Sequence, residues 1–164
     1  MSTSILVAGI GNLFLSDDGF GPEVARYLAS RDDLPDDVQV VDYGIRGMHL
    51  AYDLLDGRRA LVIVDAVPGQ GAPGEITVMQ VGDDDIGTGQ LDAHGMDPFA
   101  MLGSLRYMGG SPPTTFVVGC QPASVEEGLG LSPQVEAAVP VAAEAVLRVI
   151  HEHVLTDADA PRRS

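Results

Sequence analysis

The alternation of short, wholly apolar runs with segments of helical periodicity constrains this chain more than any other feature. The first run, Ile5–Ile10, is apolar at every position, which is typical of a strand buried on both faces of a parallel sheet. A helix-like segment follows, and the same order repeats along the chain. Strands that alternate with helices predict an α/β fold. We therefore expect three layers: a mostly parallel, twisted five-stranded sheet flanked by helices on both faces.

The expected elements occupy most of the chain. Strands are predicted at 5–10, 38–42, 60–66, 75–81 and 114–119, and helices at 20–30, 48–55, 96–107 and 133–153. The fourth strand alternates in polarity, so we expect it at a half-exposed edge of the sheet. Ser132 suits the N-cap of the last helix. A length of 164 residues predicts one domain, residues 1–155, followed by a polar C-terminal tail, residues 156–164.

The charge of the chain excludes several classes of function. Asp and Glu number 24 against 9 basic residues, which gives a formal net charge of −15. Nucleic acids and anionic membranes are polyanions, so we expect neither as a partner. All the basic residues are arginines, which excludes Schiff-base chemistry and a phosphate-loop lysine.

The single cysteine and the N-terminal residues bear on the compartment. Cys120 cannot form an intrachain disulfide, and we expect a buried, inert thiol. Residues 1–4 carry no positive charge, and the apolar runs are far shorter than the ~20 residues of a membrane span. We expect a cytoplasmic protein. No long apolar helix face is left over once the sheet is covered, so we also expect a monomer.

Aspartates gather where the predicted strands end. Asp17 and Asp18 follow the first strand, Asp42 ends the second, and Asp65 ends the third. Ligands of parallel sheets bind at this carboxyl edge. Helix caps and turns explain any one of these residues. Asp65 is harder to dismiss, because a carboxylate within an apolar run is costly unless it is paired, hydrogen-bonded or bound to a metal.

One of the four histidines could join these carboxylates. His94 lies in a loop before a predicted helix, whereas the other three suit solvated helix positions: His49, His151 and His153. A lone loop histidine is usually just solvated. If this loop folds over the acidic edge, however, Asp18, Asp65 and His94 form a set of two carboxylates and one imidazole. Such a set suits nickel, zinc or iron.

A glycine pair after the first strand invites a dinucleotide-binding interpretation. Gly9 and Gly11 match the start of that fingerprint, but position 14, which should be glycine, is Phe14. The acidic residue expected after the second strand, Asp42, also comes later than the fingerprint requires. We therefore predict no nucleotide cofactor.

The opening motif of this chain resembles that of a known enzyme family. The segment 9–21, GIGNLFLSDDGFG, closely resembles the first motif of the nickel–iron hydrogenase maturation endopeptidases. The likeness continues through Val64-Asp65-Ala66, the loop around His94, Gly119-x-Gln121-Pro122 and Gly130-Leu131-Ser132-Pro133-x-Val135. It covers essentially the whole chain in the family's order and spacing.

This resemblance implies a fold, a site and a reaction. The family fold is a twisted sheet flanked by helices, and its divalent-metal ligands correspond here to Asp18, Asp65 and His94. The first of these is often glutamate in relatives. The implied reaction removes a C-terminal extension from the precursor of a nickel–iron hydrogenase large subunit after nickel insertion. The three ligands would contact the substrate's nickel, or hold a metal whose bound water attacks the peptide; the sequence leaves both open.

The loop after the second strand departs from the family pattern. Relatives commonly carry a glycine–threonine pair there, whereas this chain keeps Gly44 and has Ile45 in place of the threonine. Because this loop is expected to help recognise the substrate, the change bears on the identity of the partner more than on the reaction.

Three other functions remain as alternatives. Peptidyl-tRNA hydrolase has a similar opening motif, but it needs a basic face for RNA, which a net charge of −15 opposes. A non-catalytic metal carrier or assembly chaperone could use the same three ligands. A purely structural α/β domain would leave Asp65 unexplained.

Overall fold

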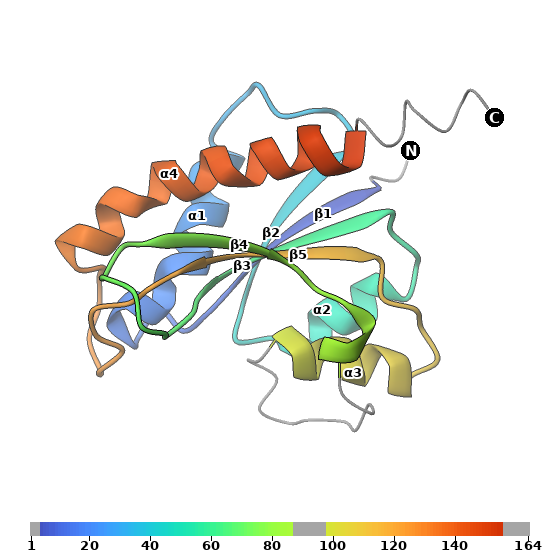
Figure 1. Ribbon diagram of the computed structural model, residues 1–164, viewed down its shortest axis with the longest axis horizontal. Coiled ribbons are helices and arrows are strands. Elements are labelled where there is room, and N and C mark those ends of the chain that lie inside the picture. The colour runs from blue at the N-terminus through green and yellow to red at the C-terminus, as the bar shows by residue number, and fades with distance from the viewer. Residues whose placement is uncertain (1–3, 87–97, 156–164) are drawn as a thin grey trace.

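The computed structural model describes residues 4–86 and 98–155, which form a single sheet with helices on both faces (Figure 1). The sheet has five strands in the order β2-β1-β3-β5-β4. Their bounds are β1 (Ile5–Ile10), β2 (Val38–Gly44), β3 (Ala60–Ala66), β4 (Ile76–Gln80) and β5 (Thr114–Cys120). Strand β4 pairs antiparallel with β5, and the other pairings are parallel. The predicted α/β class, the mostly parallel sheet and the edge position of the fourth strand are confirmed.

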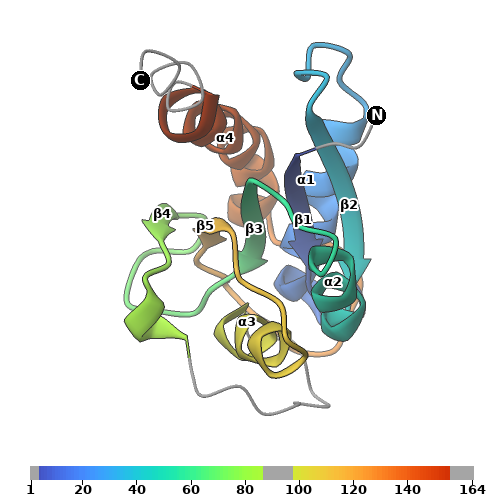
Figure 2. The ribbon, with the colours of Figure 1, turned by 90° about the vertical axis from the view of Figure 1, so that its right-hand side faces the viewer.

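Four α-helices form the outer layers, as the view along the sheet shows (Figure 2). Their bounds are α1 (Phe20–Ala29), α2 (Gly47–Leu54), α3 (Pro98–Tyr107) and α4 (Pro133–Val149). Helices α1 and α4 cover one face of the sheet, and α2 and α3 cover the other. Short 3-10 turns, η1 (Ser16–Gly19) and η2 (Asp83–Asp85), follow β1 and β4, and a π-helical segment, η3 (Ile150–Leu155), extends α4.

Two apolar clusters, one on each face of the sheet, make up the core. Alternate residues of the central strands point to opposite faces: Val62 and Val64 pack under α1 and α4, whereas Leu61 and Ile63 pack against α2 and α3. Every residue of β1 and β3 is buried. The continuous apolar runs therefore arise because both faces of these strands are covered. Within the described residues, no helix is both long and apolar enough to cross a membrane.

Element boundaries differ from the expected ones by a few residues. Strand β2 continues past Asp42 to Gly44, and Gly9 pairs with Asp42 in the register. The predicted start of the third helix, residues 96 and 97, lies outside the described residues, as does the predicted tail 156–164. Ser132 is the N-cap of α4, as expected, but its side chain makes no capping hydrogen bond.

The glycines of the opening motif permit close packing between β1, β3 and α1. A Cβ on Gly21 would lie 2.2 Å from the Ile10 carbonyl oxygen and 2.3 Å from that of Val64. A Cβ on Gly9 would lie 2.3 Å from the Gly21 carbonyl oxygen. Gly11 has φ +146° and passes beside the backbone of Asp18. The motif thus brings α1 close against the sheet.

Candidate functional site

The strand order creates a crevice between the carboxyl ends of β1 and β3. The chain leaves β1 through α1 to reach β2 on one side, and β3 lies on the other side of β1. Such a reversal of direction is the usual ligand site of an open parallel sheet. Asp18 follows β1 in η1, and Asp65 is the penultimate residue of β3. Two predicted ligands therefore come from the two sides of this crevice.

Asp18 and Asp65 line the same hollow, which has a volume of about 410 Å³. Asp65 is only 7% exposed and follows the β3 alternation that places Leu61 and Ile63 on the α2–α3 face. The other lining residues are apolar: Ala66, Val67, Pro68, Met79, Pro98, Phe99 and Val117. Two carboxylates thus share a largely apolar hollow, where bulk water screens charge less than it does at an open surface.

The backbone of the β1–η1 loop holds Asp18 in position. Its carboxylate Oδ2 accepts a hydrogen bond of 2.8 Å from the Asn12 N–H, and its own N–H donates to the Leu15 carbonyl at 3.0 Å. Asn12 Oδ1 in turn accepts a bond of 2.9 Å from the Phe14 N–H. Because these bonds are local, the loop presents the Asp18 carboxylate with little freedom to swing away.

Asp17, the neighbour of Asp18, has a structural role instead. It is fully buried, and its carboxylate accepts four hydrogen bonds from the β5–α4 loop. The donors are the N–H groups of Ala123, Ser124 and Ser132 and the Ser132 hydroxyl. Burial alone would raise the pKa of Asp17, but these hydrogen bonds outweigh it and lower the pKa below its usual value. The Ser132 hydroxyl therefore bonds Asp17 rather than capping α4.

Backbone bonds reinforce this connection between the two loops. The Ser16 N–H donates to the Gly128 carbonyl at 2.9 Å, and the Gly128 N–H donates to the Phe14 carbonyl at 2.8 Å. The Ser16 hydroxyl adds a bond of 2.7 Å to the Glu126 carbonyl. Hydrogen bonds thus connect residues 14–17 to residues 123–132. Asp18 is the next residue in the chain, so this connection also restricts its backbone. Sequence reasoning missed this role of the β5–α4 loop.

Asp42 does not join the other two carboxylates in one hollow. Its Oδ1 accepts a bond of 2.9 Å from the Gly44 N–H, which shapes the turn after β2. It lines a separate hollow between β1 and β2, next to Ile45 and Arg46. The prediction that the three carboxylates lie at one carboxyl edge of the sheet is confirmed, but Asp42 lies on the far side of β1 from the crevice that Asp18 and Asp65 share.

The third predicted ligand, His94, lies outside the described residues. In 4–86 and 98–155, no group of three or more His, Cys, Asp or Glu side chains is placed to hold a metal ion. The two aspartates nevertheless fit a divalent cation, since carboxylate oxygens are ordinary ligands for such ions. The three-ligand set stays a prediction, of which the structure describes two members.

Cys120 is unsuited to act as a nucleophile. It ends β5 in the core and is 1% exposed. Burial and the nearby charge of Asp17 raise the pKa of its thiol to about 11. The reactive thiolate is therefore scarce at neutral pH, which agrees with the predicted inert thiol.

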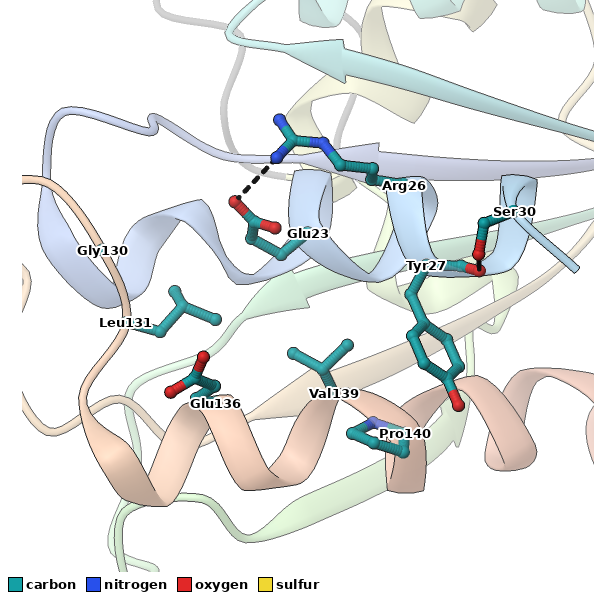
Figure 3. A pocket seen from close by; sticks show the side chains of 9 residues that line it. All are labelled: Glu23, Arg26, Tyr27, Ser30, Gly130, Leu131, Glu136, Val139 and Pro140. Carbon is teal, nitrogen blue, oxygen red and sulfur yellow. Dashed lines mark hydrogen bonds and ion pairs between the residues drawn. The ribbon is translucent and has the colours of Figure 1, made fainter.

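A further hollow, of about 590 Å³, lies between α1 and α4 (Figure 3). Tyr27 extends from α1 toward Pro140 of α4. The charged residues there include Glu23 and Arg26, which pair with each other at 3.5 Å. This groove lies in the helix layer and contains neither aspartate of the crevice.

Comparisons with known proteins agree on one family. The family model described as hydrogenase maturation protease (HycI) matches residues 22–149. The Escherichia coli hydrogenase 2 maturation protease is 36% identical over 152 residues, which cover 90% of this chain and 91% of that protein.

Solved structures give the same result. The E. coli hydrogenase maturating endopeptidase HybD superposes with a TM-score of 0.77 at 33% identity, covering 94% of each chain. A hydrogenase 2 maturation peptidase from a Thaumarchaeota archaeon gives a TM-score of 0.71 at 32% identity, covering 91% of this chain and 99% of that one. The [NiFe] hydrogenase maturation protease HycI from Thermococcus kodakarensis gives 0.70 at 25% identity, with 92% and 94% covered.

The fold, the crevice and these similarities define a peptidase. More narrowly, the chain belongs to the hydrogenase maturation protease family. The resemblance read from the opening motif is thereby confirmed, and the interpretations as a peptidyl-tRNA hydrolase or a purely structural domain are set aside.

Proposed function

We propose that this peptidase removes a C-terminal extension from the precursor of a nickel–iron hydrogenase large subunit, after nickel has been inserted. The observation that carries the proposal is the meeting of Asp18 and Asp65 in one hollow between β1 and β3. The first residues of α3, Pro98 and Phe99, line the same hollow. His94 precedes them by a few positions in the sequence, which supports its inclusion in the proposed set.

In this proposal the nickel of the precursor is part of the substrate. Asp18 and Asp65 supply carboxylate oxygens to it, and His94 supplies an imidazole nitrogen. Two carboxylates and one imidazole make a weak set for an isolated cation, so the precursor must bring most of the nickel's ligands. Recognition of nickel then makes metal loading a condition for productive docking, and no nucleotide cofactor is needed.

The chemical step is hydrolysis of one peptide bond. Water adds to the carbonyl carbon, the C–N bond breaks, and the leaving nitrogen takes a proton. A divalent ion at this place would polarise the carbonyl or lower the pKa of a bound water. The hydrogen bond from Asn12 to Asp18 would help to hold this ligand in place, and the apolar lining of the hollow would limit access of bulk water.

The proposal is tested by the intact mass of the precursor. A nickel-loaded large-subunit precursor is incubated with catalytic amounts of the protein, beside the same precursor without nickel. We expect loss of one discrete C-terminal peptide in the loaded sample only. Cleavage of both samples would contradict recognition of nickel. Complex formation without cleavage, at any ratio of the two proteins, would instead indicate a non-catalytic assembly chaperone.

We also propose that the protein acts as a monomer. Helices of the same chain cover both faces of the sheet, which supports this proposal. Light scattering during size-exclusion chromatography should give a mass near 17.1 kDa, and a mass twice that value would contradict it.

A further inference from the structure

The hollow that contains Asp18 and Asp65 continues well beyond the two carboxylates. It crosses β5 and reaches β4, because Val117 of β5 and Met79 of β4 line it as well. The charged residues of its described lining are these two aspartates, and the rest of that lining is apolar. We call the part of the hollow that is formed by four apolar residues the apolar pocket: Val67, Met79, Phe99 and Val117.

The pleat of the sheet separates Met79 from its neighbour on β4. Met79 lies opposite Val117 in the antiparallel register, and Val117 belongs to the core cluster under α2 and α3. Val78 points to the other face, since successive residues of a strand alternate. Both side chains are 44% exposed. Two adjacent, equally exposed apolar residues are therefore available, of which Met79 lines the hollow and Val78 does not.

A glycine lets Val67 lie over β5 and form a wall of the apolar pocket. A Cβ on Gly119 would lie 2.8 Å from Val67 Cγ2, so a side chain at that position would displace Val67. The Val67 N–H donates to the Cys120 carbonyl at 2.9 Å, which continues the pairing of β3 with β5. Its side chain is nevertheless 40% exposed. The wall is therefore held by the backbone and still open to a partner.

The register of the sheet gives the distance from the carboxylates to the apolar pocket. Asp65 pairs with Gly119, Gly119 pairs with Thr77, and Met79 is two residues further along β4. Two strand spacings of ~4.8 Å and two residues at ~3.3 Å give about 12 Å between Asp65 and Met79. An extended chain covers this distance in about three or four residues. A precursor whose cut bond lies at Asp65 therefore reaches the pocket with a side chain about three or four positions away.

The lining of the apolar pocket selects the chemical class of that side chain. An apolar side chain covers the exposed carbon atoms of Val67 and Met79, and removal of this surface from water favours the complex. An acidic side chain would be repelled by Asp18 and Asp65 in the same hollow. A charged or amide side chain would also lose water against the apolar wall, which is costly. The pocket therefore favours an aliphatic, methionine or phenylalanine side chain.

We propose that the apolar pocket selects precursors by binding an apolar side chain about three or four residues from the cut bond. Met79 and Val67 then determine specificity, because they contact the substrate away from the reacting bond. This inference rests on the proposed function and names a feature of the precursor that the same hollow recognises.

Met79→Gln tests the proposal in steady-state cleavage of the nickel-loaded precursor. Glutamine is about as long as methionine and adds no charge near the carboxylates, so the variant removes the apolar contact. We expect KM to rise about fivefold or more, with kcat within about twofold, since the lost contact lies away from the reacting bond. Val78→Gln is the matched control on the opposite face of β4 and should leave KM within about twofold. Thermal unfolding of both variants checks that they keep the fold.

Precursors changed at single positions complete the test. Each residue up to four positions on either side of the cut bond is replaced in turn by lysine. At one position, about three or four residues from the bond, lysine should raise the KM of the wild-type enzyme about tenfold or more. Met79→Glu should lower the KM for that precursor and for no other, because the new carboxylate pairs with the lysine.

The results distinguish this proposal from the proposed function. An unchanged KM for Met79→Gln, an equal rise for Val78→Gln, or the lack of a lysine precursor that Met79→Glu rescues would overturn the pocket proposal while leaving the proposed function intact. If wild-type protein neither cleaves nor binds the precursor, both proposals fail. Binding without cleavage that Met79→Gln weakens and Val78→Gln does not would refute the proposed function but support the apolar pocket.

Discussion

Replacing Asp17 by asparagine tests the structural role of Asp17 separately from the proposed role of its neighbour, Asp18. An asparagine oxygen in place of Asp17 Oδ2 can keep the bonds from Ala123, Ser124 and the Ser132 hydroxyl. Its NH₂ group then faces the Ser132 N–H, which now donates to Oδ1 at 2.7 Å. Two donors oppose each other, and a buried N–H is left without an acceptor.

The expected loss follows from these contacts. Losing one charge-assisted bond costs roughly 1.5–3 kcal/mol, and the remaining three bonds weaken when the acceptor becomes neutral. We therefore expect Asp17→Asn to lower the free energy of unfolding by about 3–5 kcal/mol. For a domain of this size, 1 kcal/mol corresponds to ~2–4 °C, so Tm should fall by roughly 6–20 °C.

Thermal and urea unfolding, followed by circular dichroism at pH 7, measure this loss. Asp18→Asn is the matched control, because its one backbone bond, from Asn12, can be accepted by an amide oxygen. We expect that control to change the free energy of unfolding by less than about 1 kcal/mol. If the two variants unfold within about 2 °C of each other, the structural role assigned to Asp17 is refuted.

Three further predictions follow from the packing, the thiol and the titration of Asp17. Gly21→Ala should destabilise the fold by about 3 kcal/mol or more, because its Cβ would press on the carbonyl oxygens of Ile10 and Val64; a wild-type urea midpoint would contradict this. Cys120, with a pKa of about 11, should resist iodoacetamide at pH 8 in the native protein and react once guanidinium unfolds it; rapid native labelling would show that the thiol is accessible. The lowered pKa of Asp17 contributes stability that is complete above its unfolded pKa of ~3.9 and is lost as pH falls through the lower folded value. The stability difference between wild type and Asp17→Asn should therefore stay constant from pH 7 to 5 and shrink below about pH 4; a difference that shrinks between pH 7 and 5 would rule out this titration.

Much of the fold could be predicted because its pattern is local. Strands β1 and β3 begin and end at the predicted residues, since burial on both faces makes every position apolar. The end of β2 and the partner of the Ser132 hydroxyl were less predictable. The continuation of β2 to Gly44 depends on pairing with β1, and the hydroxyl of Ser132 bonds Asp17 rather than the helix end.

The site could be predicted only in part. Asp65 was recognisable because a buried carboxylate interrupts an apolar strand. Asp17 and Asp18 are adjacent residues of the same type, so composition and periodicity do not distinguish their roles. The structural role of Asp17 depends on hydrogen bonds from a loop more than a hundred positions away. Which of the edge aspartates share a hollow follows from the strand order, which periodicity does not reveal.

The central claim is that Asp18 and Asp65 carry the processing reaction without supporting the fold. The most direct measurement is cleavage of the nickel-loaded precursor by Asp18→Asn and Asp65→Asn, and by His94→Ala, with the unfolding curve of each variant recorded in parallel. We expect each variant to release no C-terminal peptide while it keeps a cooperative transition and a native circular dichroism spectrum. Release of the peptide at the wild-type rate by any one of them would contradict the assignment of that residue.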